Sequence, residues 1–210
     1  MKTFEELKEE LLNRAKNANA CQNGYKMGLD AKNKADLLKA ITANWFWVLI
    51  DARIVDAIYL EENFTEEELS EAGIYTRKCH EVRTVSFACG SATVKAYDSA
   101  TVKACGSATV EAYDSATVKA YGSATVEAYD SATVEAYDSA TVKAYDSATV
   151  RACGSATVEA CGSATVEAYD ESYVEDCTGN IRPGYDYAIV KDYHNHKIYI
   201  RKGKFEIIEV

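Results

Sequence analysis

Between residues 91 and 170 the chain alternates polar and small apolar residues with a period of eight. Each eight-residue unit, here called an octad, reads Ser-Ala-Thr-Val, a charged residue, Ala, Tyr or Cys, and then Asp or Gly. The charged fifth residue must face water, and alternation along a strand places the Val and both Ala on the opposite side. In the octad at 107–114 we therefore expect Ala108, Val110 and Ala112 to be buried.

The end of each octad has the composition of a turn, because Asp, Gly and Ser all favour sharp reversals of the backbone. One octad reverses the chain once, so two octads complete a coil of sixteen residues and equivalent positions stack at i and i+16. Ten octads follow one another without insertion, and degenerate octads flank them at 83–90 and 171–178. This pattern predicts a two-sided β-solenoid whose thin core contains only Val and Ala.

Residues 1 to about 80 show helical periodicity instead. Thr3 followed by Glu6 has the spacing of a capping box, and Thr65 followed by Glu68 repeats it. A broad apolar stripe with a period near 3.6 runs from Leu37 to Val55. The helices expected from these patterns cover Thr3 to about Asn17, Ala20 to Leu29, Leu37 to Val55, and a short segment that starts after Thr65 and ends at Gly73.

The last part of the chain has strand composition, in AIVKDY at 188–193 and IYIRKGKFEIIEV at 198–210, with turns expected at Asn195 and Gly203. Open solenoid ends expose unpaired strand edges and need caps. The chain is therefore expected to be α+β, with a helical N-terminal domain at 1–80, a β-solenoid at 83–178 and a C-terminal β-hairpin cap at 179–210.

The seventh and eighth positions of the octad divide the solenoid into two unequal columns. One column contains mainly Tyr followed by Asp, whereas the other has mostly Gly at the eighth position. A row of exposed aromatic side chains often marks an interface. The first column supplies the candidate binding residues, which are Tyr97, Tyr113, Tyr129, Tyr145, Asp98, Asp114, Asp130 and Asp146.

Charge and composition narrow the class of protein. The net charge is −10 and the isoelectric point is near 4.9, so the surface as a whole does not attract nucleic acid. No apolar stretch is long enough to span a bilayer, and the start MKTFEELKEELL has acidic residues where a signal peptide has basic ones. The cysteines number seven, which is odd, and five of them follow the repeat rather than a disulfide framework. We expect a cytoplasmic protein that contacts neither membranes nor nucleic acid directly.

The sequence contains no phosphate-binding loop, no nucleophile elbow and no convergent acid–base pair. An active site also needs a unique arrangement of groups, which ten copies of one octad do not provide. His194 and His196 beside Asp192 form one alternative, a metal site, although a polar hairpin turn explains them equally well. We therefore expect no enzymatic activity, no cofactor and no metal.

Two resemblances add to this picture. AYGSATV at 120–126 resembles the repeats of bacterial ice-nucleation proteins, which implies a β-solenoid and ice binding through Ser-x-Thr pairs such as Ser107 with Thr109. The whole chain is similar to octapeptide-repeat proteins of gut bacteria and their phages, which implies the same order of helical segment, repeats and β tail. The stretches that carry this second resemblance are ACQNG at 20–24, WFW at 45–47, GIY at 73–75 and KIYIRKGKFEII at 197–208.

These observations favour a non-enzymatic scaffold or binding protein. Within that class we favour a phage-associated inhibitor that binds a host protein, such as one that handles nucleic acid, through the Tyr and Asp column, with the acidic row imitating a polyanion. A homodimer formed through the Tyr column is a further expectation. The alternatives are ice binding through the Ser-x-Thr ladders and a small-ligand site in the helical domain around Cys21, Trp45 and Asp51.

Overall fold

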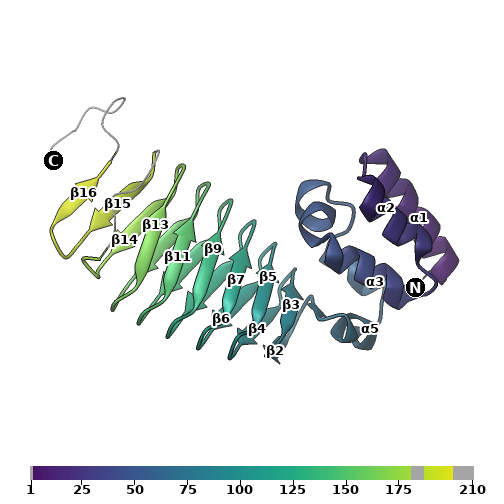
Figure 1. The fold of residues 1–210 in the computed structure, drawn as a ribbon, viewed down its shortest axis with the longest axis horizontal. Coiled ribbons are helices and arrows are strands. Elements are labelled where there is room, and N and C mark those ends of the chain that lie inside the picture. The colour runs from purple at the N-terminus through teal and green to yellow at the C-terminus, as the bar shows by residue number, and fades with distance from the viewer. Residues whose placement is uncertain (1, 181–186, 201–210) are drawn as a thin grey trace.

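The computed structural model describes residues 2–180 and 187–200, and it contains an N-terminal helical region followed by a long β-solenoid (Figure 1). Two parallel sheets form the two sides of the solenoid, and an antiparallel hairpin ends it. The expected α+β class, with a solenoid of sixteen-residue coils and a C-terminal hairpin, is confirmed. Among the residues described, no helix has both the length and the apolar character needed to cross a membrane.

Five α-helices and one π-helical turn make up the helical region. Both predicted capping boxes form: the hydroxyl of Thr3 accepts the backbone N–H of Glu6 at 3.3 Å, and that of Thr65 accepts the N–H of Glu68 at 3.1 Å. The elements are α1 (Phe4–Asn17), α2 (Gln22–Asp30), α3 (Lys34–Ala43), η1 (Trp47–Asp51), α4 (Ala57–Asn63) and α5 (Glu66–Glu71).

The prediction of one helix from Leu37 to Val55 is wrong, because α3 ends at Ala43 and the π-helical turn η1 follows. Asn44 explains the break: its side-chain amide donates to the carbonyl of Ala40 at 2.9 Å, and such side-chain bonds compete with the regular helical pattern. The chain then starts α4, which the sequence pattern did not indicate. The carboxylate of Asp56 caps α4 by accepting the N–H of Tyr59 at 2.7 Å.

The strands are four residues long through the repeats and alternate between the two sheets. The seven-stranded sheet contains β1 (Ile74–Tyr75), β3 (Val85–Ala88), β5 (Thr101–Ala104), β7 (Thr117–Ala120), β9 (Thr133–Ala136), β11 (Thr149–Ala152) and β13 (Thr165–Ala168). The nine-stranded sheet contains β2 (Cys79–Val82), β4 (Thr93–Ala96), β6 (Thr109–Ala112), β8 (Thr125–Ala128), β10 (Thr141–Ala144), β12 (Thr157–Ala160), β14 (Tyr173–Asp176), β15 (Ile189–Asp192) and β16 (Lys197–Tyr199).

Pairing is parallel and in register, so each residue of a repeat lies beside its equivalent sixteen positions away, as Val110 lies beside Val126. The expected buried set is confirmed, because Ala108, Val110 and Ala112 have no exposed surface. The same holds for the equivalent Val and Ala of the other octads, which form one continuous core between the sheets. Small side chains at every inward position let the two sheets pack closely.

Both ends of the solenoid depart from the repeat. The sheets begin at Ile74, before the boundary placed at residue 83, and the first coil is shorter, since Ile74 pairs with Phe87 and Cys79 with Thr93. At the other end β15 adds to β14 in parallel and β16 folds back on β15 around the expected turn at Asn195. The other expected turn, at Gly203, lies outside the described residues.

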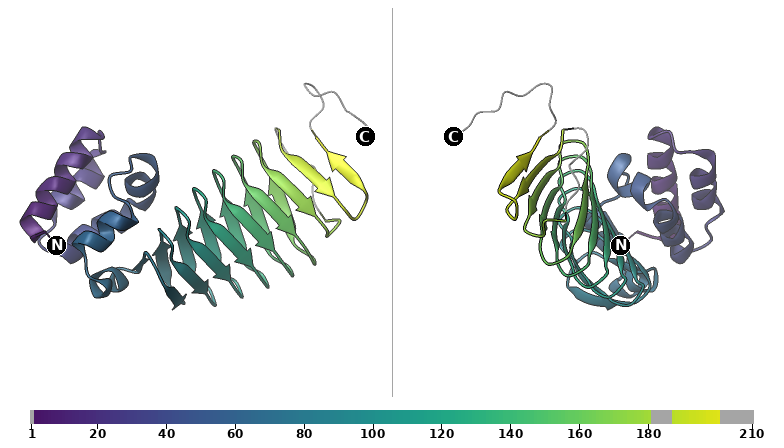
Figure 2. Two further views of the ribbon diagram at one scale, coloured as in Figure 1. Left: turned by 180° about the vertical axis from the view of Figure 1, so that it is seen from behind. Right: turned by 60° about the vertical axis from the view of Figure 1, so that its left-hand side comes forward.

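The helical region packs against the first coils of the solenoid and stays at that end of the rod (Figure 2). Trp45 is buried with its ring 4.8 Å from that of Phe87, and Phe46 lies 5.2 Å from Tyr121, both distances joining ring centroids. Beneath these contacts the side chains of Cys89 and Cys105 are buried. At these two positions the helices leave too little room for a tyrosine ring, and the smaller cysteine stands there instead.

This packing predicts opposite effects for the same substitution at two positions of one column. Cys105→Tyr forces a ring beneath the helical region, so we expect a loss of about 1–3 kcal/mol in the free energy of unfolding and faster proteolysis of residues 2–63. Cys153→Tyr lies at a half-exposed site beside Tyr137 and Tyr169. This substitution is expected to change neither the free energy of unfolding nor the rate of proteolysis. Chemical denaturation and limited proteolysis check this, and equal effects at both sites would contradict it.

Candidate binding surface: the tyrosine and aspartate columns

The eight predicted residues lie together along one edge of the solenoid, where the chain passes from the nine-stranded to the seven-stranded sheet. In each coil a Tyr directly follows the last residue of β4, β6, β8 or β10, and an Asp follows the Tyr. We call these eight residues the Tyr/Asp edge. Its members are Tyr97, Tyr113, Tyr129, Tyr145, Asp98, Asp114, Asp130 and Asp146.

The four tyrosines form a continuous stack. Successive ring centroids are 5.1 Å apart and the ring planes differ by 8° to 11°. Each ring is half-buried because its faces lie against its neighbours. At the start of the stack the guanidinium of Arg83 lies 5.3 Å from the centroid of Tyr97. The edge thus presents ring rims along its length, and a cation covers the outer ring face at its first end.

The hydroxyl groups of two of these tyrosines donate a hydrogen bond to the glutamate two residues earlier in the chain. The hydroxyl of Tyr113 donates to Glu111, and that of Tyr129 donates to Glu127, each at 2.7 Å. The hydrogen bond to Glu111 raises the pKa of Tyr113 to about 12, with burial as a second cause. Lys95 lies 2.8 Å from the same carboxylate, and together with the Tyr113 hydroxyl it lowers the pKa of Glu111.

The aspartates have a structural role that sequence reasoning missed. Each adopts a positive φ of 53° to 59°, a conformation that Gly and, less often, Asp or Asn tolerate. The carboxylate of Asp114 accepts the backbone N–H of Asp98 at 3.0 Å, and Asp130 and Asp146 repeat this bond at 3.2 and 3.4 Å. The signal for this role was that the eighth residue of each of the ten octads at 91–170 is Asp or Gly. The acidic row is therefore held in place by the backbone.

Asp98, the first carboxylate of the row, binds a side chain instead. Arg83 donates to it from Nη1 at 2.7 Å while the same guanidinium covers Tyr97. Arg83 therefore contacts both kinds of residue that form the Tyr/Asp edge. The next coils each offer a carboxylate and a ring rim, because their ring faces are stacked on neighbouring rings.

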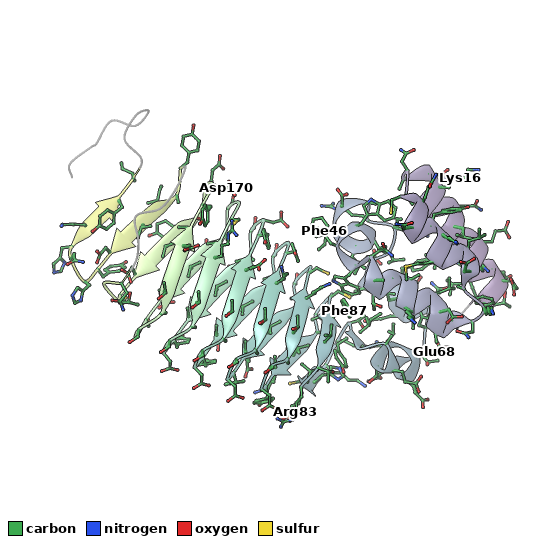
Figure 3. The ribbon with its side chains drawn as sticks, in the orientation of Figure 1. Lys16, Phe46, Glu68, Arg83, Phe87 and Asp170 are labelled. Atoms are coloured by element: carbon green, nitrogen blue, oxygen red, sulfur yellow. The ribbon has the colours of Figure 1, made fainter. Side chains whose placement is uncertain are left out.

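The opposite edge differs in sequence and in surroundings. The first residues at the seventh and eighth positions of this edge are Cys89 and Gly90. The helical region lies against them, since a Cβ added at Gly90 would lie 2.8 Å from the Cβ of Ala57. In Figure 3 Arg83 and Asp170 mark the two edges, and Phe46 lies on the side of Asp170. Together with the turns of this edge, η1 and the start of α4 enclose a groove of about 1010 Å³. The Tyr/Asp edge is therefore the one that the helices leave open.

The other candidate residues are dispersed. Trp45 is buried against Phe87, Asp51 lines the groove on the opposite edge, and Cys21 caps α2, so the structure does not bring these three together. Asp192 accepts the N–H of Asn195 at 2.8 Å and so shapes the hairpin turn near the histidines. Within residues 2–180 and 187–200, no three His, Cys, Asp or Glu side chains cluster as a metal site.

The Ser and Thr positions also stack in register, as Thr101 does on Thr117. Charged side chains share their side of the sheet, for example Lys119, which lies 2.8 Å from Glu135. The charged side chains thus interrupt the flat rows of hydroxyl groups in every strand of the repeat. Ice binding stays a prediction.

Substitutions at Asp114 separate its two structural contributions. Asn keeps both the tolerance of positive φ and an acceptor oxygen, so Asp114→Asn is expected to change the unfolding midpoint little. Asp114→Gly loses the acceptor but also removes the Cβ from the left-handed region, whereas Asp114→Ala loses the acceptor and keeps a Cβ there, so Ala is expected to be less stable than Gly by about 1–2 kcal/mol. Denaturant midpoints in the order Asn, Gly, Ala test this, and an Asn variant as unstable as the Ala variant would contradict it.

The bond between Tyr113 and Glu111 predicts a pH effect. Because the pKa of Tyr113 rises from 10.0 to about 12 on folding, its contribution to stability is complete below pH 10 and disappears as the pH rises through about 12. In Glu111→Gln we expect Tyr113 to titrate closer to 10, and stability to depend less on pH in this range. NMR titration of labelled tyrosine rings measures the shift, with the Tyr129 signal as the internal control.

No family model matches this chain, and neither a curated protein nor a solved structure matches it. The conclusions on function consequently depend on the geometry of the Tyr/Asp edge and on its contrast with the opposite edge, which the helical region covers.

Proposed function

We propose that this protein is a non-enzymatic scaffold that binds an arginine-rich surface of a partner protein along the Tyr/Asp edge. The observation that carries the proposal is the contact of Arg83, whose guanidinium lies over the ring of Tyr97 and pairs with Asp98 at 2.7 Å. The chain's own arginine occupies the first position of the edge. Arginines of a partner would pair with the carboxylates of the following coils and lie along the ring rims, because the ring faces there are stacked on one another.

The electrostatics of the rod support a basic partner. Residues 91–170 carry eleven acidic and five basic side chains, a net charge of −6. Surface charge of one sign steers partners of the opposite sign and speeds their association. Two copies meeting through the same edge would bring two acidic rows together, so a basic partner is favoured over a homodimer.

The repetition of the edge supports binding at several positions at once. Neighbouring coils lie about 4.8 Å apart, the usual strand spacing, and each carries the same pair of side chains. Because backbone N–H groups orient three of the four carboxylates, little side-chain freedom remains to be lost on binding. Several weak contacts of one kind then add up to useful affinity.

Within this proposal we favour a host protein with a nucleic-acid-binding surface as the partner, in the cytoplasm of a bacterium, with the chain acting as a phage-associated inhibitor. The regular row of carboxylates offers such a surface an alternative to the phosphate backbone, which is recognised mainly through Arg and Lys. This finer assignment is supported by the acidic row and by the resemblance to octapeptide-repeat proteins.

A quadruple variant tests the proposal, with Asn in place of Asp98, Asp114, Asp130 and Asp146. Asn retains the turn geometry, so the fold is kept while four charges are removed. We expect wild-type protein to retain a partner from a bacterial lysate and to bind an arginine-rich peptide more tightly than a lysine-rich one, with both interactions weakening as salt increases. The quadruple variant is expected to lose both.

The matched control removes four charges elsewhere, with Gln in place of Glu5, Glu9, Glu62 and Glu67, which are exposed residues of the helical region. This control is expected to bind as the wild type does. Partner binding that survives the quadruple Asp→Asn change and high salt, or that is lost equally in the control, would overturn the assignment to the Tyr/Asp edge.

A further inference from the structure

Helix α2 lies over the helical region without entering its core. None of its nine residues is buried, and Met27 and Leu29 are 37% and 53% exposed. Gly24 and Gly28 bring the backbone close to its neighbours, since a Cβ at Gly28 would lie 3.3 Å from the side chain of Leu12. The helix therefore covers the space between α1 and α3 and leaves part of it unfilled.

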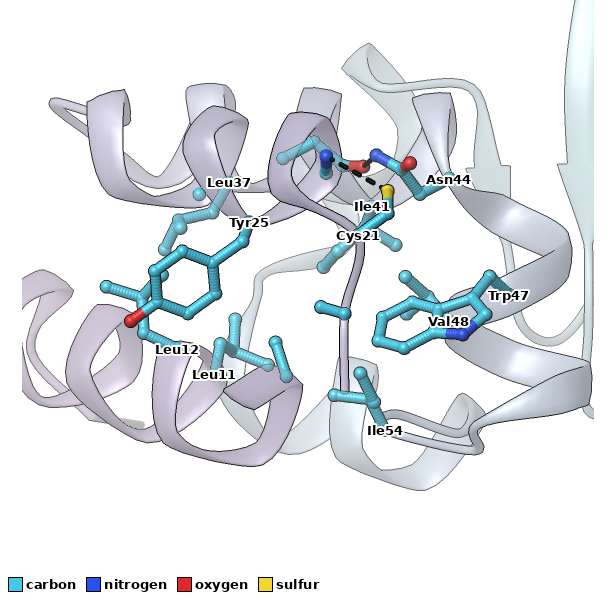
Figure 4. Close-up of a pocket in the computed structure, with 15 residues that line it drawn as sticks. Leu11, Leu12, Cys21, Tyr25, Leu37, Ile41, Asn44, Trp47, Val48 and Ile54 are labelled. Atoms are coloured by element: carbon cyan, nitrogen blue, oxygen red, sulfur yellow. Dashed lines mark hydrogen bonds between the residues drawn. The ribbon is translucent and has the colours of Figure 1, made fainter. Parts of the chain in front are cut away.

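This unfilled space is a cavity of about 280 Å³ that is lined by α1, α2, α3 and η1 and is open on one side (Figure 4). None of the fifteen residues that line it is charged. For comparison, an apolar cavity of about 150 Å³ suffices to hold benzene, so this one has room for a second ring. The apolar walls are formed mainly by Leu11, Leu12, Leu37, Ile41, Val48 and Ile54.

A few polar atoms lie at one end of the cavity. The amide nitrogen of Asn44 donates to the carbonyl of Ala40 at 2.9 Å, whereas its oxygen accepts no hydrogen bond from a described residue. The thiol of Cys21 accepts the N–H of Gly24 at 3.4 Å and is exposed. The oxygen of Asn44 is thus available as an acceptor, and the exposed Cys21 lines the same end of the cavity.

The π-helical geometry of η1 shapes the remaining wall. The N–H of Ala52 bonds to the carbonyl of Trp47 at 2.8 Å, five residues earlier, and Trp47 and Val48 both line the cavity. Short π-helical turns occur often at functional sites. The same departure from α-helical geometry that divides the predicted helix after α3 therefore supplies an aromatic wall.

We propose that the helical region binds a small uncharged molecule in this cavity, a one- or two-ring aromatic compound with one hydrogen-bond donor directed at the oxygen of Asn44. Mostly apolar linings with a few placed polar groups are typical of small-molecule sites. The absence of charged residues among those that line the cavity disfavours an ionic ligand, since burying an unpaired charge is costly. This site is separate from the Tyr/Asp edge and is independent of it.

The probe for the test is 1-naphthol, with naphthalene-1-sulfonate as its charged counterpart. Titration of the full chain, followed by fluorescence and calorimetry, is expected to show saturable binding of 1-naphthol to one site. The sulfonate is expected to bind at least about tenfold more weakly, which corresponds to 1.4 kcal/mol. Absent or non-saturable binding of 1-naphthol, or equal binding of both compounds, would overturn the proposal.

Two substitutions on α3 locate the site. Ala40 lines the cavity, so Ala40→Leu fills it and is expected to abolish 1-naphthol binding while the melting temperature is kept or raised. Ala43 is exposed and lies outside the cavity, so Ala43→Leu is the matched control and is expected to bind as the wild type does. Equal binding by both variants would place the probe elsewhere.

Protection of Cys21 gives a second measurement that needs no variant. Cys21 and Cys79 are both exposed, and only Cys21 lines the cavity. We expect bound 1-naphthol to slow alkylation of Cys21 and to leave that of Cys79 unchanged, as measured by mass spectrometry of the peptides. An unchanged rate at Cys21 under saturating 1-naphthol would contradict the assignment.

Discussion

Parallel pairing in register with a period of sixteen residues is the constraint on which the rest of this structure depends. Each strand hydrogen-bonds to its equivalents in the adjacent coils, as β8 does to β6 and β10, and a shift by one residue would move every Val from the core to solvent. The inward positions must then be small enough for two sheets to meet. The eighth position must tolerate positive φ, which favours Gly, Asp and Asn, and this chain uses Asp and Gly.

A second consequence of this pairing is that many outward side chains meet copies of themselves. Tyrosine suits such a position, because identical rings stack at a distance near the strand spacing. Like charges repel one another when they stack in this way, and two arrangements reduce the repulsion. Lys95 and Lys119 each pair with a Glu of the next coil, and the Asp carboxylates accept backbone N–H groups. The side chains available for binding are thus also those that hold neighbouring coils together.

Local and periodic features were predictable from the sequence. Capping boxes involve residues three apart, and the buried set around Val110 follows from strict alternation, so both were confirmed. The end of α3 and the start of α4 involve local bonds of Asn44 and Asp56, but the continuous apolar stripe up to Val55 concealed them. The burial of Cys105 depends on contacts between distant segments, which one sequence does not display. For the candidate site, the columns were predictable, whereas the bonds from Asp carboxylates to the backbone and the contact of Arg83 required the positions of neighbouring coils.

The alternation of octads between two sheets also limits how the length of the chain can change. Gain or loss of two octads alters the rod by one coil and leaves every column intact. Gain or loss of one octad transfers all later strands to the other sheet, so tyrosines such as Tyr129 and Tyr145 would join the edge that carries Gly90, and the C-terminal hairpin would extend the other sheet. Slippage by 48 nucleotides during replication of such a repetitive gene therefore keeps every column intact. Slippage by 24 nucleotides changes which side chains lie on each edge.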